Sequence, residues 1–259
     1  MQGSTHGEGR LRRDRRIILA GLVSIAAVAW AYLLHLTVAM GTMETEMALA
    51  MQPWTILDLV LLWLMWTVMM VAMMVPTATA MLLAFAAMNR RRRAHEQPYV
   101  STAIFLGGYV VVWTGFSVLA TLVQWGLHRA ALLSPMMVST SPLLGGVLLL
   151  AGGVFQWTPL KAACLKHCRS PLGFMMTEWR DGRQGAFTMG LRHGMYCTGC
   201  CGVLMVLLFV AGVMHLLWVA TLTLFVLVEK VVPHGALVGR VAGGVLVLAG
   251  LVLLGQGLR

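Results

Sequence analysis

Residues 54–88 read WTILDLVLLWLMWTVMMVAMMVPTATAMLLAFAAM, and this stretch decides the fold class. It contains one charged side chain, that of Asp58, and it exceeds the roughly 20 apolar residues that a helix needs to cross a bilayer. The sequence therefore predicts an all-α, polytopic transmembrane helical bundle of about seven spans. Six spans are the alternative, because the last part of the fifth run is nearly continuous with the sixth and only 212–215 offers a turn. The seven runs are 17–39, 54–88, 101–125, 142–158, 193–213, 216–232 and 236–255.

The overall composition agrees with an integral membrane protein. Of the 259 residues, 59% are apolar and only 11% are charged, whereas soluble domains carry about 25% charged residues. The predicted spans leave no large soluble domain, which excludes a soluble enzyme, a disordered tail protein and a nucleic-acid-binding protein. The chain also has no GxxxxGK[ST] loop, which argues against an ATP-driven pump.

The distribution of basic residues predicts an orientation in the membrane. With the N-terminus inside and seven crossings, the cytoplasmic segments hold every lysine and arginine except Arg129 and Arg259. This asymmetry follows the positive-inside rule and accounts for the net charge of +10. The sequence thus predicts a basic cytoplasmic tail at 1–16 and one transmembrane domain at 17–259. That domain would have a cytoplasmic loop at 159–192 and its C-terminus outside.

The five cysteines fall into two tight clusters, KAACLKHCR and RHGMYCTGCC. On a helix, the cysteines of each cluster share one face, and each cluster has a histidine one turn from a cysteine. Thiolate and imidazole ligands at this spacing suit Cu(I) or Zn(II), so we predict metal binding with copper as the ion and zinc as the alternative. Thiol redox chemistry and simple burial of small apolar side chains are the competing interpretations. The candidate metal ligands are Cys164, His167, Cys168, His193, Cys197, Cys200 and Cys201.

Methionines and two charged residues are secondary candidates. Met70, Met74 and Met81 lie on one helical stripe and are a candidate secondary path for copper, although methionine also serves as a flexible core filler. Glu229 and Lys230, at the inner end of the sixth run, are a candidate charged site. The simpler interpretation is that they form an interfacial ion pair, and the alternative is a role in a proton or metal path.

Glycines recur every four residues in the last apolar run. Gly235, Gly239 and Gly243 form a stripe that lets a neighbouring helix approach closely. The neighbour is expected within the same chain, with a dimer face as the alternative. The oligomeric state is not predicted.

Several of these motifs together resemble a bacterial family of uncharacterised, predicted metal-binding integral membrane proteins. The resemblance covers roughly residues 54–255 and departs from the family pattern at Gly202, where a tryptophan is expected after the paired cysteines. It implies metal binding in a bacterial inner (cytoplasmic) membrane, without naming the ion. The residues that carry it are Met65-Trp66, Met69, Met70, Met73, Met74, Pro76, Thr158-Pro159-Leu160-Lys161, Cys164, Cys168-Arg169, Gly194, Cys197, Gly199-Cys200-Cys201, Leu204-Met205, Glu229-Lys230 and Pro233.

The leading functional prediction is copper capture, storage or delivery through a Cys/His site. The expected partners are membrane lipid and a metalloprotein that receives the ion, and catalysis is not required. One alternative is a subunit or maturation factor of a membrane metal-dependent oxidase or oxygenase. The other is a membrane thiol-disulfide oxidoreductase that uses Cys197 and Cys200, although a cytoplasmic location argues against it.

Overall fold

The computed structural model describes residues 3–47, 55–93, 100–130, 132 and 141–257. Within these residues the fold is a helical bundle with no strand, which confirms the predicted all-α class. The first two and last two residues, which belong to the predicted basic tail and the predicted outer C-terminus, lie outside the described residues. The helices are α1 (Gly3–Met47), α2 (Ile56–Arg93), α3 (Thr102–Arg129), α4 (Pro142–Phe155), α5 (Pro159–Arg169), α6 (Pro171–Glu178), α7 (Gly182–Val206), α8 (Leu208–Ala211), α9 (Leu216–Val231) and α10 (Gly235–Gly257).

Five of the described helical segments are long and apolar enough to cross a membrane. They lie within α1, α2, α3, the continuous stretch of α7 and α8, and α10. The number of candidate spans is six if α4 and α5, which are bent by 62° relative to each other, form one broken span. The predicted count of seven also included 216–232, where α9 has 16 residues. At 1.5 Å per residue such a helix is about 24 Å long, shorter than a hydrocarbon core of about 30 Å.

The break between α4 and α5 has a local cause in the sequence. Pro159 stands at the start of α5, and the Thr158 hydroxyl caps that helix by accepting a hydrogen bond from the backbone N–H of Lys161. A serine or threonine cap followed by proline begins a new helix. The region predicted as a cytoplasmic loop at 159–192 therefore contains α5, α6 and the first turns of α7.

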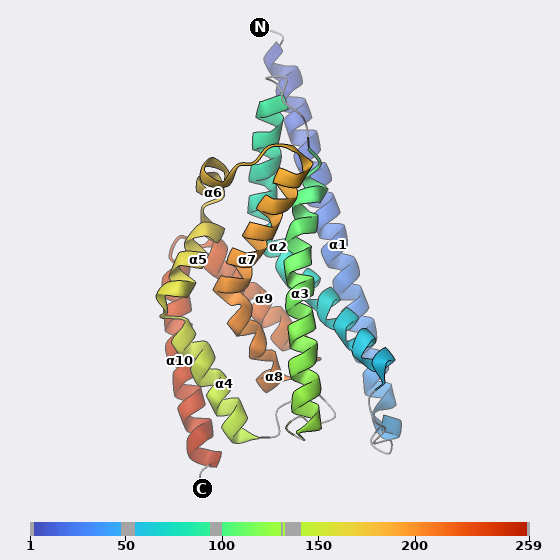
Figure 1. Cartoon of the computed structure of the whole chain (residues 1–259), viewed down its shortest axis with the longest axis vertical. Coiled ribbons are helices and arrows are strands. Elements are labelled where there is room, and N and C mark those ends of the chain that lie inside the picture. Colours follow the sequence, from blue (N-terminus) through green and yellow to red (C-terminus); the bar gives the residue numbers. More distant parts are fainter. Residues whose placement is uncertain (1–2, 48–54, 94–99, 131, 133–140, 258–259) are drawn as a thin grey trace.

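The turn between the fifth and sixth apolar runs lies where the sequence predicts it. α8 ends at Ala211, and Gly212 has φ +97°, a left-handed conformation that glycine adopts readily. α9 then begins at Leu216 and runs back along the bundle (Figure 1).

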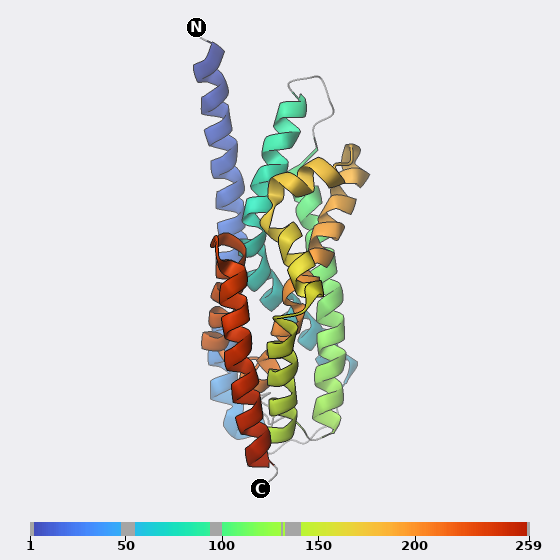
Figure 2. The same cartoon turned by 90° about the vertical axis from the view of Figure 1, so that its left-hand side faces the viewer.

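Two close helix pairs frame the bundle: α3 packs against α7, and α4 packs against α10 (Figures 1 and 2). A Cβ atom at Gly190 of α7 would overlap the carbonyl oxygen of Phe105 in α3. A Cβ at Gly243 of α10 would lie 2.9 Å from the carbonyl oxygen of Gly153 in α4. The predicted glycine stripe of α10 therefore faces neighbours within the chain, which confirms the intramolecular interpretation.

Two arginine–aspartate ion pairs lie at the end of the bundle where α1 begins and α2 ends (Figure 1). The start of α1 and the end of α2 are joined there by an ion pair between Arg90 and Asp14, with N and O atoms 2.6 Å apart. Arg92 pairs with Asp181, just before α7, at 2.9 Å. The start of α1 and the end of α10 lie at opposite ends of the bundle (Figures 1 and 2).

Candidate metal centre

Three thiols from two turns of α7 form a compact group in the bundle interior. The sulfur atoms of Cys197, Cys200 and Cys201 all lie within 4.8 Å of one another, and each side chain is at most 1% exposed. The spacing of three and four residues places them on one helical face, as the sequence predicts. Among the described residues, these three form the group of Cys, His, Asp or Glu ligand atoms close enough to hold one ion.

Two further sulfur atoms extend this group to other helices. The Cys200 sulfur lies 3.9 Å from that of Cys168 on α5, so the two predicted cysteine clusters do meet. The Cys201 sulfur lies 3.9 Å from the thioether sulfur of Met74 on α2. The fifth cysteine, Cys164, is partly exposed and points toward Gly199, where a Cβ would lie 2.7 Å from its sulfur.

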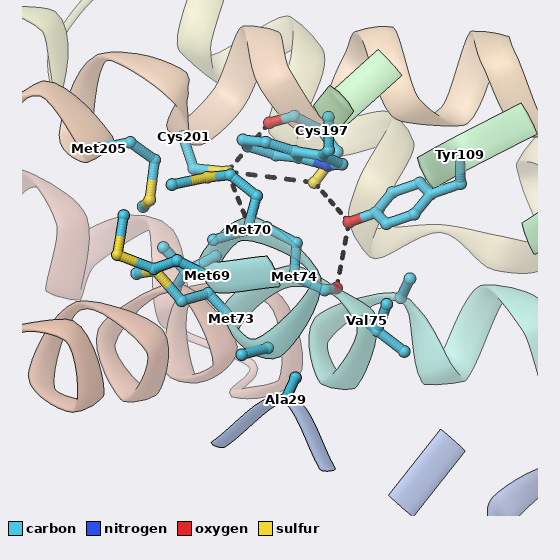
Figure 3. Packing of buried hydrophobic residues seen from close by; sticks show 14 of the residues in the cluster. Ala29, Met69, Met70, Met73, Met74, Val75, Tyr109, Cys197, Cys201 and Met205 are labelled. Carbon is cyan, nitrogen blue, oxygen red and sulfur yellow. Dashed lines mark hydrogen bonds between the residues drawn. The ribbon is translucent and has the colours of Figure 1, made fainter. Parts of the chain in front are cut away.

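Polar groups from two other helices contact Cys197. The Tyr109 hydroxyl of α3 lies 3.1 Å from the Cys197 sulfur and donates a hydrogen bond to the backbone carbonyl of Met74 (Figure 3). The Lys230 ammonium of α9 lies 3.0 Å from the same sulfur and also donates to the Thr77 hydroxyl at 3.0 Å. Cys197 is thus the cysteine that connects the sulfur group to a buried positive charge.

The two candidate histidine ligands lie outside the close sulfur group. His193 is 2% exposed and stacks on Tyr109 with ring centroids 5.4 Å apart, and neither of its ring nitrogens has a hydrogen-bond partner among the described residues. The His167 ring stacks on that of Tyr196 with ring centroids 4.2 Å apart, and its Nδ1 lies 2.9 Å from the Ala163 carbonyl oxygen. In the part of the chain that the structure describes, the close donor set therefore consists of sulfur atoms.

The expected interfacial ion pair between Glu229 and Lys230 is wrong. Both residues are buried, at 1% and 8% exposed, and neighbouring side chains on a helix point in different directions. Glu229 pairs instead with Lys161 of α5, with Nζ and Oε1 2.7 Å apart. Arg169 donates to the backbone carbonyls of Glu229, Val232 and Pro233, which fixes α5 to the end of α9.

The candidate methionine path is buried throughout. Met70, Met74 and Met81 are at most 2% exposed, and Met74 reaches the sulfur group directly. Met81 lies two helical turns beyond Met74 along α2.

Several polar residues of the centre are not identified as site residues by the sequence. Tyr109 and Thr77 lie in apolar helices, and no local pattern marks either one. Lys161 belongs to the Thr158-Pro159 motif, but its contact with Glu229 joins residues 68 positions apart. Only the packing of α2, α3, α5 and α9 around α7 brings these groups together.

The chemistry of this centre agrees with the comparisons to known proteins. Closely spaced thiols with an adjacent thioether are soft ligands, which suit soft ions such as Cu(I). A protein-family model described as PpoB2, copper chaperone, matches residues 63–253, a range that contains all five cysteines. No curated protein and no solved structure gave a match to the chain. Because the family model covers most of the chain, this protein belongs to the PpoB2 copper chaperone family.

Proposed function

We propose that this protein is a membrane-embedded copper chaperone that holds Cu(I) at the cysteine group of α7 and delivers it to a partner metalloprotein. The observation that carries the proposal is the approach of the Cys197, Cys200 and Cys201 sulfur atoms to within 4.8 Å of one another in the bundle interior. Family membership supports copper as the ion and delivery as the task. Copper is here the cargo of the protein.

The donor atoms favour Cu(I) over Zn(II). Structural zinc sites have four Cys or His ligands in a closed tetrahedral set. Here the close neighbours of the cysteine group are the Cys168 thiol and the Met74 thioether, and thioethers are ligands of Cu(I) more than of zinc. The Met74 thioether is a weaker donor than a thiolate, and a weaker donor at the edge of the site also suits an ion that must be released again.

The charge of the site is compatible with burial in an apolar bundle. A Cu(I) ion held by two thiolates carries one net negative charge, and an unpaired charge in the membrane interior is strongly unfavourable. The Lys230 ammonium, 3.0 Å from the Cys197 sulfur, provides the opposite charge. Glu229 and Lys161 already neutralise each other, so they do not compete for this role.

The proposed orientation keeps the N-terminus and the basic end of the bundle inside and the C-terminus outside. The arginine pairs at the ends of α1, α2 and α7 support it, because basic residues are retained on the cytoplasmic side. The opposite placement of the start of α1 and the end of α10 agrees with an odd number of crossings. We propose the bacterial inner membrane as the location.

A deletion strain tests the copper function. We expect growth and copper content of the strain to change with external copper and to be insensitive to external zinc. The wild-type chain should restore both, and C197S/C200S/C201S should restore neither at equal abundance in the membrane. T198V is the matched control, because the Thr198 hydroxyl lies in the same turn and makes no hydrogen bond to a described residue. A zinc-dependent phenotype, or rescue by the triple serine variant, would refute the proposal.

A further inference from the structure

A group of methionine side chains borders the cysteine group on one side. Met69 and Met73 of α2 and Met205 of α7 are each at most 1% exposed. Figure 3 shows Cys201 between Cys197 and Met205, with Met69 and Met73 on the Met205 side. In this view (Figure 3) the three side chains lie on the same side of the cysteine group, and all three belong to one cluster of buried residues.

The register of α7 continues the row of sulfur atoms beyond the cysteines. Cys197, Cys201 and Met205 follow one another at intervals of four residues, so they share a helical face with about 6 Å between successive positions along the axis. This row leads from the cysteine group toward α8. In the proposed orientation, α8 lies on the outer side of the cysteine group (Figure 1).

Methionines are distributed unevenly around α2. The large apolar side chains that α2 exposes to its surroundings are leucine, isoleucine and valine, including Leu57, Leu61 and Leu64 at 65%, 54% and 42% exposed. Its interior also holds leucine, valine and aromatic side chains, but the buried methionines have no counterpart among the exposed side chains: Met65, Met69, Met70, Met73, Met74 and Met81 are each at most 5% exposed. This placement of thioethers on the inner side is consistent with a chemical use of sulfur.

We propose that Met69, Met73 and Met205 form a second, thioether site for Cu(I), which receives the ion on the outer side and supplies the cysteine group. The inference rests on the proposed function, because the ion must continue to the cysteines. A thioether is neutral and binds Cu(I) without losing a proton, whereas a thiol must release its proton to become a ligand. Three neutral thioethers also leave the positive charge of Cu(I) uncompensated, so the thioether site binds more weakly than the anionic thiolates do. The ion passes on by ligand exchange with no change in its oxidation state, and each thiol that becomes a ligand releases its proton.

X-ray absorption of selenomethionine-labelled protein distinguishes the two sites directly. Copper bound to cysteine has sulfur neighbours, and copper bound to labelled methionine has selenium neighbours. We expect the first equivalent of Cu(I) added to the purified full chain to show mainly sulfur, with at most the one selenium of Met74. The second equivalent should add a shell of about three selenium neighbours.

Variants assign the selenium shell to the three methionines. M69L/M73L/M205L should lose the second equivalent, keep the first, and fill the cysteine group at least about tenfold more slowly in proteoliposomes. M176L/M195L is the matched control, because Met176 and Met195 are 79% and 58% exposed, and it should behave as wild type. Leucine preserves volume, so the packing penalty is usually below about 1.5 kcal/mol.

The outcomes separate this inference from the proposed function. Absence of the selenium shell in the wild-type protein, which needs no variant to fold, overturns the thioether site. An unchanged selenium shell and filling rate in M69L/M73L/M205L overturns it as well. Absence of the sulfur shell at the first equivalent would instead overturn the cysteine site and hence the proposed function.

Discussion

The ammonium nitrogen of Lys230 lies 3.0 Å from the thiol sulfur of Cys197, in a part of the bundle where both side chains are buried. A lysine in such a place needs an anionic or strongly accepting neighbour, and sulfur bound to Cu(I) is one. We therefore propose Lys230 as a positioning residue for the proposed copper site, one that does not itself ligate the ion.

Replacing this lysine should weaken copper binding without unfolding the protein. We expect K230M to lower Cu(I) affinity by roughly 10–100-fold, the range found for groups that support metal ligands. Competition with a chromogenic Cu(I) chelator measures the affinity, and K166M, at an exposed lysine of α5, is the control. Equal affinities of K230M and K166M would show that the Lys230 contact is structural only.

The buried pair between Lys161 and Glu229 should contribute to stability as a unit. Removing one partner leaves the other charge buried, so K161M and E229Q should each destabilise the protein by about 3–5 kcal/mol. The double variant K161M/E229Q should lose much less free energy of unfolding than the sum of the losses in the two single variants. Denaturant unfolding in detergent micelles measures these free energies, and strictly additive losses would argue against a coupled pair.

The contact between α3 and α7 depends on the absence of a side chain at Gly190. We expect G190A to destabilise the bundle by about 1–3 kcal/mol, because the new methyl group would overlap the Phe105 carbonyl. G115A in α3 is the matched control, since a Cβ there meets no atom of the described residues within 4 Å. Thermal unfolding of the two variants compares them, and identical midpoints would contradict this helix packing.

Reporter fusions test the proposed orientation. An alkaline phosphatase fused after the C-terminus should be active, because that end is proposed to lie outside. The same enzyme inserted at 170–185 should be inactive, since the arginine pairs hold this region at the inner end. The reverse pattern of activities would invert the orientation and place the basic end outside.

Much of the fold follows from the sequence because long apolar runs bounded by charge or turn residues have few other stable arrangements in a membrane. The glycine at 212 predicts the turn at 212–215, and Gly212 has the left-handed φ of +97° that a turn requires. Hydropathy does not predict the bend between α4 and α5, because it measures how apolar a segment is and contains no information on the direction of the helix axis. The signal for this bend is the Thr158-Pro159 cap, which begins a second helix.

The sequence predicts which residues of the candidate centre share a face of one helix, but not which residues of different helices meet. The helical period alone places Cys197, Cys200 and Cys201 on one face. It also places Cys164 and Cys168 together, but it does not predict that Cys168 lies 3.9 Å from the Cys200 thiol of the other cluster. Contacts between helices, such as that of Tyr109 with Cys197, depend on the rotation and crossing of each helix. A single sequence does not encode these quantities in any local pattern.

Binding of Cu(I) by the cysteine group of α7, as proposed, is tested most directly by the amount of copper bound per chain. Purified wild-type protein and the T198V control should each hold about one tightly bound Cu(I) per chain at cysteine sulfur, apart from the weaker second equivalent at the methionines. C197S/C200S/C201S, folded to the same helix content, should lose this tightly bound ion. Tight, sulfur-ligated copper retained at the wild-type amount in the triple serine variant would contradict the claim.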